Sequence, residues 1–168
     1  MLRVLLLPLA LLLTGCVSVP RVAAPPPAAA AFPVIAFFTG PTEGEGVLRI
    51  ATRDERRIAV TSMGRVEGGE LRVEQLVREE GKPPRQREWR IREVAPGRFA
   101  GSLSDAAGPV TGVAMPGRLT LRFPMRGAMQ AEQQITLSGD GRSARNILTV
   151  RRFGLTLAVL DETIRRRD

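Results

Sequence analysis

The sequence predicts an all-β protein in which an antiparallel meander of about eight to ten strands closes into a barrel. Turn signals rich in Gly and Pro recur at short intervals, and the segments between them alternate apolar and polar residues. The connections have hairpin length, without a long crossover. Closure removes exposed strand edges, and a barrel of this size can enclose one small ligand. A two-sheet sandwich is the alternative architecture.

The chain begins with a segment, residues 1–15, that we interpret as a lipoprotein signal peptide. Arg3 supplies a basic start, and the apolar run 4–13 is too short to span a hydrocarbon core of ~30 Å. The run ends in Leu13-Thr14-Gly15-Cys16, which resembles the bacterial lipobox. The resemblance implies cleavage before Cys16 and lipidation of Cys16. An ordinary signal peptide with an incidental cysteine is the alternative.

Residues 16–31 comprise the lipidated Cys16 and a tether rich in Pro and Ala. Pro-rich chain extends by ~3.1 Å per residue, so this tether reaches ~45 Å. A short helix over residues 28–31 is the alternative. Val17 stands where an inner-membrane retention signal usually has Asp. We therefore expect the anchor to hold the protein on the outer membrane of a bacterial cell envelope, facing the periplasm.

Residues 32–168 form the predicted barrel domain, which opens with a helical turn at 33–38. The expected strands cover residues 45–53, 56–65, 69–79, 84–94, 97–104, 109–115, 117–125, 130–138, 144–152 and 154–165. Alternation is clearest at 119–123, where apolar and polar residues exchange at every position. Trp89 alternates with charged neighbours, which predicts that it is buried. Leu155, Leu157 and Val159 are expected to share the inward face of the last strand.

Several polar residues fall on the apolar faces of these strands and are candidates for a binding site. They are Gln75, Arg87, Asp105 and Asn146. A buried charge is costly unless paired, so we expect Arg87 and Asp105 to be partners. In the functional interpretation they form the polar end of a ligand cavity that Trp89 and Phe99 also line, and Arg87 binds a carboxylate or phosphate headgroup. The alternatives are a structural ion pair at one barrel end, or polar residues at strand ends that are already in solvent.

Composition restricts the chemistry. The sequence has no His, no Tyr and one Cys, which excludes His-dependent triads and an intrachain disulfide. It shows no nucleophile elbow, phosphate loop or metal-ligand spacing, so we predict a protein that is not an enzyme and has no cofactor or metal. The net charge is +8, or about +7 once Arg3 is removed with the signal. Export argues against a nucleic-acid partner and favours an anionic envelope component; a compositional bias of the genome explains the charge equally well.

Short motifs along the domain carry a resemblance to a known family. They are Phe37-Phe38-Thr39-Gly40, Gly44-Glu45-Gly46, Gly69-Glu70-Leu71-Arg72-Val73, Arg87-Glu88-Trp89, Gly97-Arg98-Phe99-Ala100-Gly101 and Arg152-Phe153-Gly154. In this order and spacing they resemble the domain of unknown function 3833 family of proteobacterial lipoproteins. The resemblance implies a lipocalin-like barrel and no established activity. Glu132-Gln133-Gln134-Ile135 departs from the family's Asp-Trp-Met-like segment; if the family's aromatic residues line a ligand site, this departure implies a wider, more aliphatic or otherwise altered cavity.

Two functions remain open from the sequence. In the first, the barrel binds a lipid-like or other apolar ligand close to the membrane that its lipid anchor enters. In the second, the protein is a non-catalytic envelope scaffold or interaction protein whose barrel core is filled. The volume of the cavity distinguishes them, because an apolar void of a few hundred cubic ångströms indicates a ligand site and a solid core indicates a scaffold.

Overall fold

The computed structural model describes residues 17–21, 25 and 30–167. The predicted signal peptide, Cys16 and most of the tether lie outside the described residues. The described part of the chain contains no helix that is long and apolar enough to cross a membrane. Residues 30–32 are attached to the rest of the domain by backbone hydrogen bonds to residues 115 and 117. The N–H of Phe32 donates to the carbonyl of Met115 over 3.1 Å, and the N–H of Gly117 donates to the carbonyl of Ala30 over 2.8 Å.

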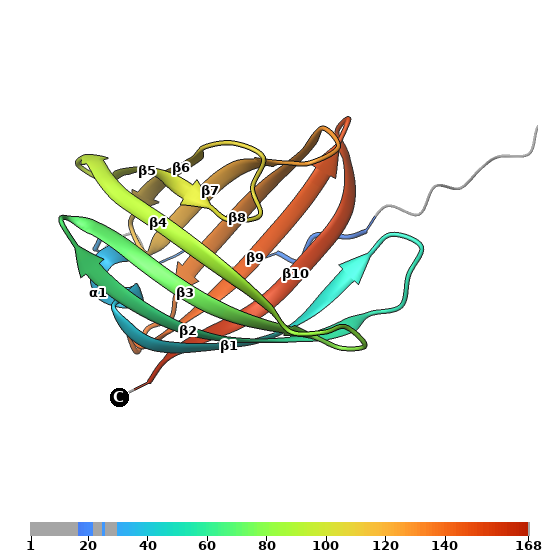
Figure 1. Ribbon diagram of the computed structural model, residues 1–168, viewed down its shortest axis with the longest axis horizontal. Helices are drawn as coiled ribbons and strands as arrows, with labels where there is room; N and C mark the ends of the chain where they lie inside the picture. The colour runs from blue at the N-terminus through green and yellow to red at the C-terminus, as the bar shows by residue number, and fades with distance from the viewer. Residues whose placement is uncertain (1–16, 22–24, 26–29, 168) are drawn as a thin grey trace, which may run out of the picture.

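The described residues form one short helix and ten strands (Figure 1). In chain order these are α1 (Val34–Phe38), β1 (Gly40–Ile50), β2 (Arg56–Glu67), β3 (Glu70–Glu79), β4 (Arg85–Ala95), β5 (Arg98–Leu103), β6 (Val110–Met115), β7 (Arg118–Met125), β8 (Met129–Leu137), β9 (Ser143–Arg152) and β10 (Leu155–Arg166). Each strand pairs antiparallel with the next, and β1 also pairs with β10, which closes the barrel. The predicted all-β barrel is confirmed, and the sandwich alternative is wrong.

The first strand is longer than the sequence predicts. It begins at Gly40 rather than at residue 45, and it pairs on both sides through the segment that contains Gly44 and Gly46. Glycine weakens a strand in isolation and usually indicates a turn or a close approach of another group. Gly44 and Gly46 mark a close approach, because side-chain and backbone atoms of β10 lie directly against both glycines.

Two glycines form the tight hairpin between β2 and β3. Gly68 and Gly69 connect β2 to β3 with φ values of +56° and +78°. Positive φ at both central residues defines the turn whose twist matches that of paired strands. The register from Ile58 opposite Glu79 to Glu67 opposite Glu70 is therefore continuous.

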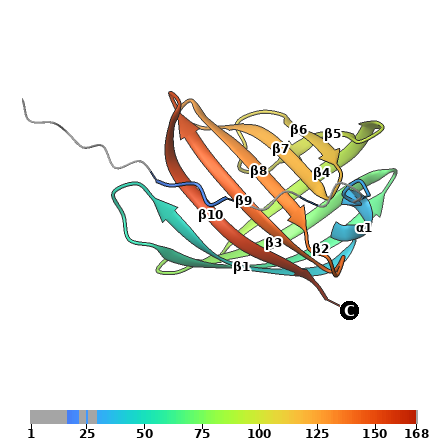
Figure 2. The same cartoon turned by 180° about the vertical axis from the view of Figure 1, so that it is seen from behind.

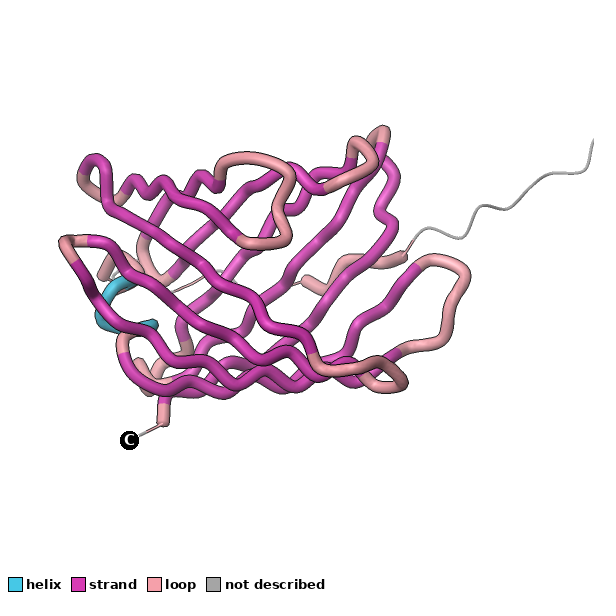
Figure 3. Tube along the Cα trace, viewed as in Figure 1, coloured by secondary structure: helices cyan, strands magenta, loops and turns pink. Residues whose placement is uncertain are grey.

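Helix α1 closes one end of the barrel (Figures 2 and 3). Phe32, Val34 and Phe37 are buried, and the rings of Phe32 and Phe37 meet edge to face at 5.2 Å between centroids. The end of the helix presses on β2 at Gly64, where a side chain would overlap the carbonyl oxygen of Phe38. The other end of the barrel has no such helix among the described residues.

The interior contains two hydrophobic clusters. The larger one surrounds α1 and extends through the barrel to Trp89, which is 6% exposed and meets Phe123 edge to face at 5.5 Å. The predicted burial of Trp89 is confirmed. The smaller cluster consists of Ile58, Val60 and Val77 near the end without a helix. Polar side chains lie between the two clusters, and they define the candidate site.

A candidate ligand cavity inside the barrel

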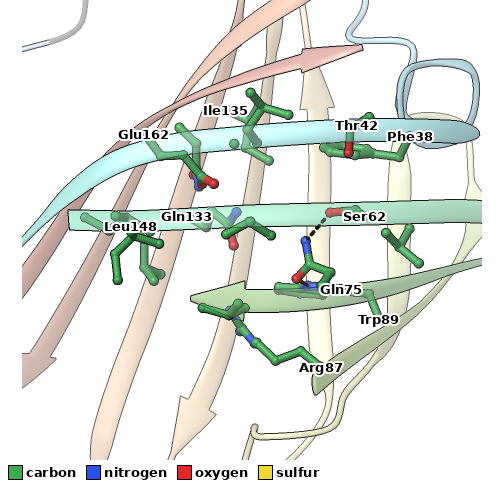
Figure 4. Close-up of a pocket in the computed structure, with 18 of the residues that line it drawn as sticks. Phe38, Thr42, Ser62, Gln75, Arg87, Trp89, Gln133, Ile135, Leu148 and Glu162 are labelled. Atoms are coloured by element: carbon green, nitrogen blue, oxygen red, sulfur yellow. Dashed lines mark hydrogen bonds between the residues drawn. The ribbon is translucent and has the colours of Figure 1, made fainter. Parts of the chain in front are cut away.

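A cavity of about 130 Å³ lies inside the barrel, between the larger cluster and the end without a helix (Figure 4). Phe38 of α1 lines it toward the closed end, and Glu79 and Arg85 line it toward the other. All three residues of the smaller cluster face it. Figure 4 shows side chains from opposite walls, among them Gln75 and Glu162, converging on this space. The volume is small for a barrel of ten strands, because aromatic and branched side chains fill the rest.

One wall of the cavity is a row of polar residues on three adjacent strands. Ser62, Gln75 and Arg87 are direct cross-strand neighbours on β2, β3 and β4. The amide of Gln75 donates to Oγ of Ser62 over 3.2 Å, and its Oε1 accepts from Nε1 of Trp89 over 2.9 Å. Both ends of the Gln75 amide are therefore occupied. The row forms because residues opposite one another in an antiparallel pair point to the same face of the sheet.

Arg87 and Asp105 form the predicted pair, with Nε of Arg87 donating to Oδ1 of Asp105 over 3.0 Å. Arg85 donates to the other carboxylate oxygen over 2.7 Å. Burial lowers the pKa of Arg87, and the negative charge of Asp105 partly opposes this effect. Asp105 follows β5, is about one third exposed (36%) and does not line the cavity. The charge of Arg87 is thus compensated from outside the cavity wall.

The opposite wall contains an acid that the sequence analysis did not identify. Glu162 is 5% exposed, and its carboxylate accepts a hydrogen bond from Nδ2 of Asn146 over 2.7 Å. Burial raises the pKa of Glu162 above the ordinary value, while the amide of Asn146 and the positive charge of Arg87 oppose the rise. Asn146 is itself 2% exposed, and its Oδ1 has no hydrogen-bond partner within the described residues.

A β-bulge explains why Glu162 was missed. The register between β9 and β10 shifts between Thr156 and Ala158. Alternation extrapolated from Leu155 and Leu157 points the odd-numbered residues inward, whereas beyond the bulge Leu160, Glu162 and Ile164 line the cavity. The expectation that Leu155, Leu157 and Val159 share an inward face is therefore wrong. Leu155 is 51% exposed, and Asp161 on the opposite face bonds to Arg145 outside the cavity.

Two glycines of β1 make room for Glu162. A methyl group on Gly44 would overlap Oε1 of the Glu162 carboxyl, and one on Gly46 would overlap the backbone oxygen of Asp161. Any larger residue at either position would displace the carboxyl or separate the strands. The Gly-Glu-Gly sequence at 44–46 therefore serves the buried acid. The two glycines at 44 and 46 inside a strand are the sequence signal that could have indicated a close approach of another group here.

The structure divides the predicted site residues into two groups. Arg87, Trp89 and Asn146 line the cavity. Phe99 is buried in the larger cluster and does not line the cavity, and Asp105 lies behind the wall. Phe99 is excluded by register, because it lies opposite Glu93, beyond the end of the cavity. The segment 132–135 contributes Gln133 and Ile135, so a change in that segment alters the lining directly.

The described residues contain no group of three His, Cys, Asp or Glu side chains that could hold a metal ion. The cavity offers apolar walls for contact area and a few polar groups for orientation, which is the usual composition of a small-molecule site.

The closed antiparallel meander around an internal cavity, with one end covered by a helix, defines a lipocalin-like barrel. The chain belongs to the family described as "Protein of unknown function (DUF3833)", whose model matches residues 10–166. The resemblance inferred from the short motifs is confirmed. No curated protein matches the sequence significantly.

Two solved structures share the fold. An S-type phycobiliprotein lyase, CPES, from Guillardia theta is 8% identical with a TM-score of 0.61, and the match covers 80% of this chain and 91% of the lyase. A protein of unknown function from the DUF3598 family of Nostoc punctiforme is 12% identical with a TM-score of 0.56, and the match covers 88% of this chain and 54% of that protein. At these identities the likeness establishes the fold alone.

Proposed function

We propose that this protein is an envelope lipoprotein whose barrel binds a small apolar or amphipathic molecule without transforming it. In this proposal Cys16 is lipidated and holds the barrel on the periplasmic side of the outer membrane. The observation that supports ligand binding most directly is the cavity, which separates two apolar clusters and contains a buried acid. Fold similarity to a phycobiliprotein lyase is compatible with a barrel that holds a small molecule.

The volume defines the size of the ligand. At about 130 Å³ the cavity is smaller than the ~300–1,000 Å³ of most ligand pockets. It is close to the engineered apolar cavity of ~150 Å³ that binds benzene. We therefore propose a single short alkyl chain or one small ring as the buried part. A two-chain phospholipid exceeds this space.

The polar lining argues against the filled scaffold. Replacing a buried charged group by apolar residues of similar volume is often neutral or stabilising. A core with only a structural role therefore gains nothing from Glu162, nor from the unpartnered oxygen of Asn146 beside it. Both residues line the cavity.

Trp89 provides the test. It is the only tryptophan of the chain, there is no tyrosine, and its ring lines the cavity, so intrinsic emission reports on this site. We expect 1-bromohexane to quench that emission saturably, because bromine quenches on contact. Leu148→Phe, which fills the cavity, should abolish the saturable quenching. Leu155→Phe adds the same atoms on an exposed position and should leave it unchanged.

Two results would contradict the proposal. One is the absence of saturable quenching in the wild-type protein. The other is identical quenching in wild type and Leu148→Phe, which would place the probe elsewhere. If the quenching is saturable and is lost in Leu148→Phe, mass spectrometry of material extracted from natively purified protein identifies the natural ligand.

A further inference from the structure

We infer that the tip of the β9–β10 hairpin, residues 152–155, contacts a bilayer surface that contains anionic phospholipid. Phe153 enters the headgroup region, and the arginines beside it bind the phosphates. This inference goes beyond ligand binding in the cavity. It rests on the proposed function only in taking Cys16 as a lipid anchor, and it adds a second contact between the barrel and the membrane that the anchor enters.

The tip of this hairpin presents apolar side chains to solvent. Phe153 is 83% exposed, more than any other large hydrophobic residue in the described part of the chain. Leu155, on the other side of Gly154, is 51% exposed. Single exposed hydrophobic residues are normal on a protein surface, but here two of them share one projecting turn. A specific protein interface usually buries about 800 Å² on each partner. A turn of four residues is small for that purpose and suits insertion into a bilayer surface.

The backbone of Phe153 adds a second cost at the same position. Its φ of +50° lies in the left-handed region, which is unfavourable for a bulky residue. Asn-Gly is the preferred sequence for a turn with positive φ at both central residues, so asparagine would relieve the strain and remove the apolar surface. The only ring contact of Phe153 within the described residues is the guanidinium of Arg152, 5.0 Å from the ring centroid. The fold therefore gains little from this phenylalanine, and strained positions of this kind are concentrated at functional sites.

Basic side chains lie beside the ring. Arg152 is exposed, and so is Arg126 in the turn between β7 and β8. The two turns are neighbours, because Gln130 of β8 pairs with Arg151 of β9. Neither Arg126 nor Arg152 has an ion-pair partner in the part of the chain that the structure describes. An aromatic ring among arginines matches a bilayer interface, where the ring lies at headgroup level and the cations attract anionic lipid.

The start of the described chain lies at the same end of the barrel. Residues 17–21 and the β9–β10 hairpin are both found at the end opposite α1 (Figures 1 and 2). Val19 within this segment is 41% exposed. Val17 directly follows Cys16 in the sequence, so an acyl group on Cys16 is attached next to a segment at this end. The proposed anchor and the hairpin tip therefore favour the same partner, a membrane.

Brominated phospholipids test the contact, because bromine quenches a nearby indole. Phe153→Trp is prepared as the full-length, lipidated protein in vesicles of phosphatidylcholine and phosphatidylglycerol in equal amounts, with bromine near the top of the acyl chains. Trp89 is the only tryptophan of the natural chain, so the wild-type signal is subtracted. An indole buried ~5–10 Å into the interface lies within reach of the bromine. We expect strong quenching and a blue-shifted maximum.

Val94→Trp is the matched control. Val94 is 60% exposed near the end of β4, at the barrel end that α1 closes. An indole at this position faces away from the proposed contact, in the same protein on the same vesicles. We expect its emission to be neither quenched nor shifted when brominated lipid replaces ordinary lipid.

The arginines are tested in the Phe153→Trp background. Replacing Arg126 and Arg152 by Gln should lower the ratio of inserted to free tip by about fivefold for each arginine. The quenching should also fall in vesicles of phosphatidylcholine alone. Quenching that is independent of both changes would overturn the assignment of these arginines to lipid phosphates.

Phe153→Asn distinguishes membrane contact from a structural role. Asparagine tolerates the positive φ, so the urea midpoint of the variant should equal or exceed that of the wild type. With Leu155→Trp as the reporter on the same tip, adding Phe153→Asn should weaken the quenching. A lower urea midpoint together with unchanged quenching would make Phe153 a structural residue and overturn the inference.

The outcomes separate this inference from the proposed anchor. If the wild-type protein does not float with the vesicles, the anchor at Cys16 fails, and the argument for a bilayer partner fails with it. If the protein floats and Phe153→Trp is quenched no more than Val94→Trp, the anchor stands and the hairpin does not touch the bilayer. That second result would overturn the inference and leave a protein partner for the exposed tip.

Discussion

Gly44 of β1 lies against the carboxyl of Glu162 on β10, so closely that a methyl group at position 44 would overlap Oε1 of the acid. The two residues are far apart in sequence and meet because β1 and β10 close the barrel. The carboxyl of Glu162 therefore occupies the space that a side chain at position 44 would fill. This relationship couples the seam of the barrel to the polar part of its cavity.

The first prediction follows from this overlap. Gly44→Ala should destabilise the protein by about 1–3 kcal/mol, as overpacking in a closed core does. Adding Glu162→Ala should recover part of the loss, because it removes the atoms that the methyl group meets. Urea denaturation of the two single variants and the double variant measures the coupling energy. Gly139→Ala, with open space around the position, should be close to neutral. Strict additivity of the two single effects would contradict the contact.

The second prediction concerns pH. Because the pKa of Glu162 is raised by burial, the folded protein binds a proton more tightly than the unfolded chain, and this acid destabilises the fold as pH rises. Glu162→Gln should therefore equal wild type in stability below the ordinary value of 4.5 and exceed it increasingly as pH rises through the folded pKa. Every tenfold difference in proton affinity corresponds to about 1.4 kcal/mol. A pH-independent difference in urea midpoint would show that Glu162 titrates normally.

The third prediction concerns the partner of Arg87. Asp105→Asn removes the charge that compensates a guanidinium whose side chain is only 15% exposed. We expect a loss of about 1–2 kcal/mol, between the values for exposed and fully buried pairs. Glu132→Gln, which breaks the more exposed pair with Arg122, should cost less than about 1 kcal/mol. Thermal denaturation of both variants provides the comparison, and equal losses would argue against a special role for Asp105.

The fourth prediction concerns the indole donor. Trp89→Phe retains an aromatic ring against Phe123 and leaves Oε1 of Gln75 without its donor. We expect a loss of about 1–3 kcal/mol for the unpaired acceptor together with the packing lost in a smaller ring. Gln75→Met in the Trp89→Phe background removes the unpaired oxygen and should recover stability. No recovery would assign the loss to packing alone. Circular dichroism suits this pair, because Trp89→Phe has no tryptophan emission.

The fifth prediction concerns the anchor. Cys16 lies outside the described residues, and its lipidation rests on the lipobox resemblance of Leu13-Thr14-Gly15-Cys16. Metabolic labelling with a fatty-acid analogue should mark the wild-type protein and leave Cys16→Ser unlabelled, with the variant lost from the membrane fraction. Labelling of both proteins to the same extent would contradict lipidation at this residue.

Local pattern was a good guide to the strands and a partial guide to the site. Alternation about Trp89 predicted its burial, and the pairing of Arg87 with Asp105 followed from the cost of an isolated buried charge. Phe99 shows the limit of this reasoning. Alternation correctly predicts that the side chain of Phe99 points inward. Whether an inward side chain lines the cavity or packs in the hydrophobic core depends on its position along the barrel axis. That position is fixed by the register with the neighbouring strands.

The sequence by itself determined the strands, the turns and the family, because backbone alternation and glycine turns are local properties that neighbouring residues encode. Only the tertiary structure decided where the cavity lies and which acid faces it. The bulge in β10 reverses the phase of alternation before Glu162, and barrel closure brings Gly44 against that residue. Both effects arise from pairing between strands, so no window of sequence contains them.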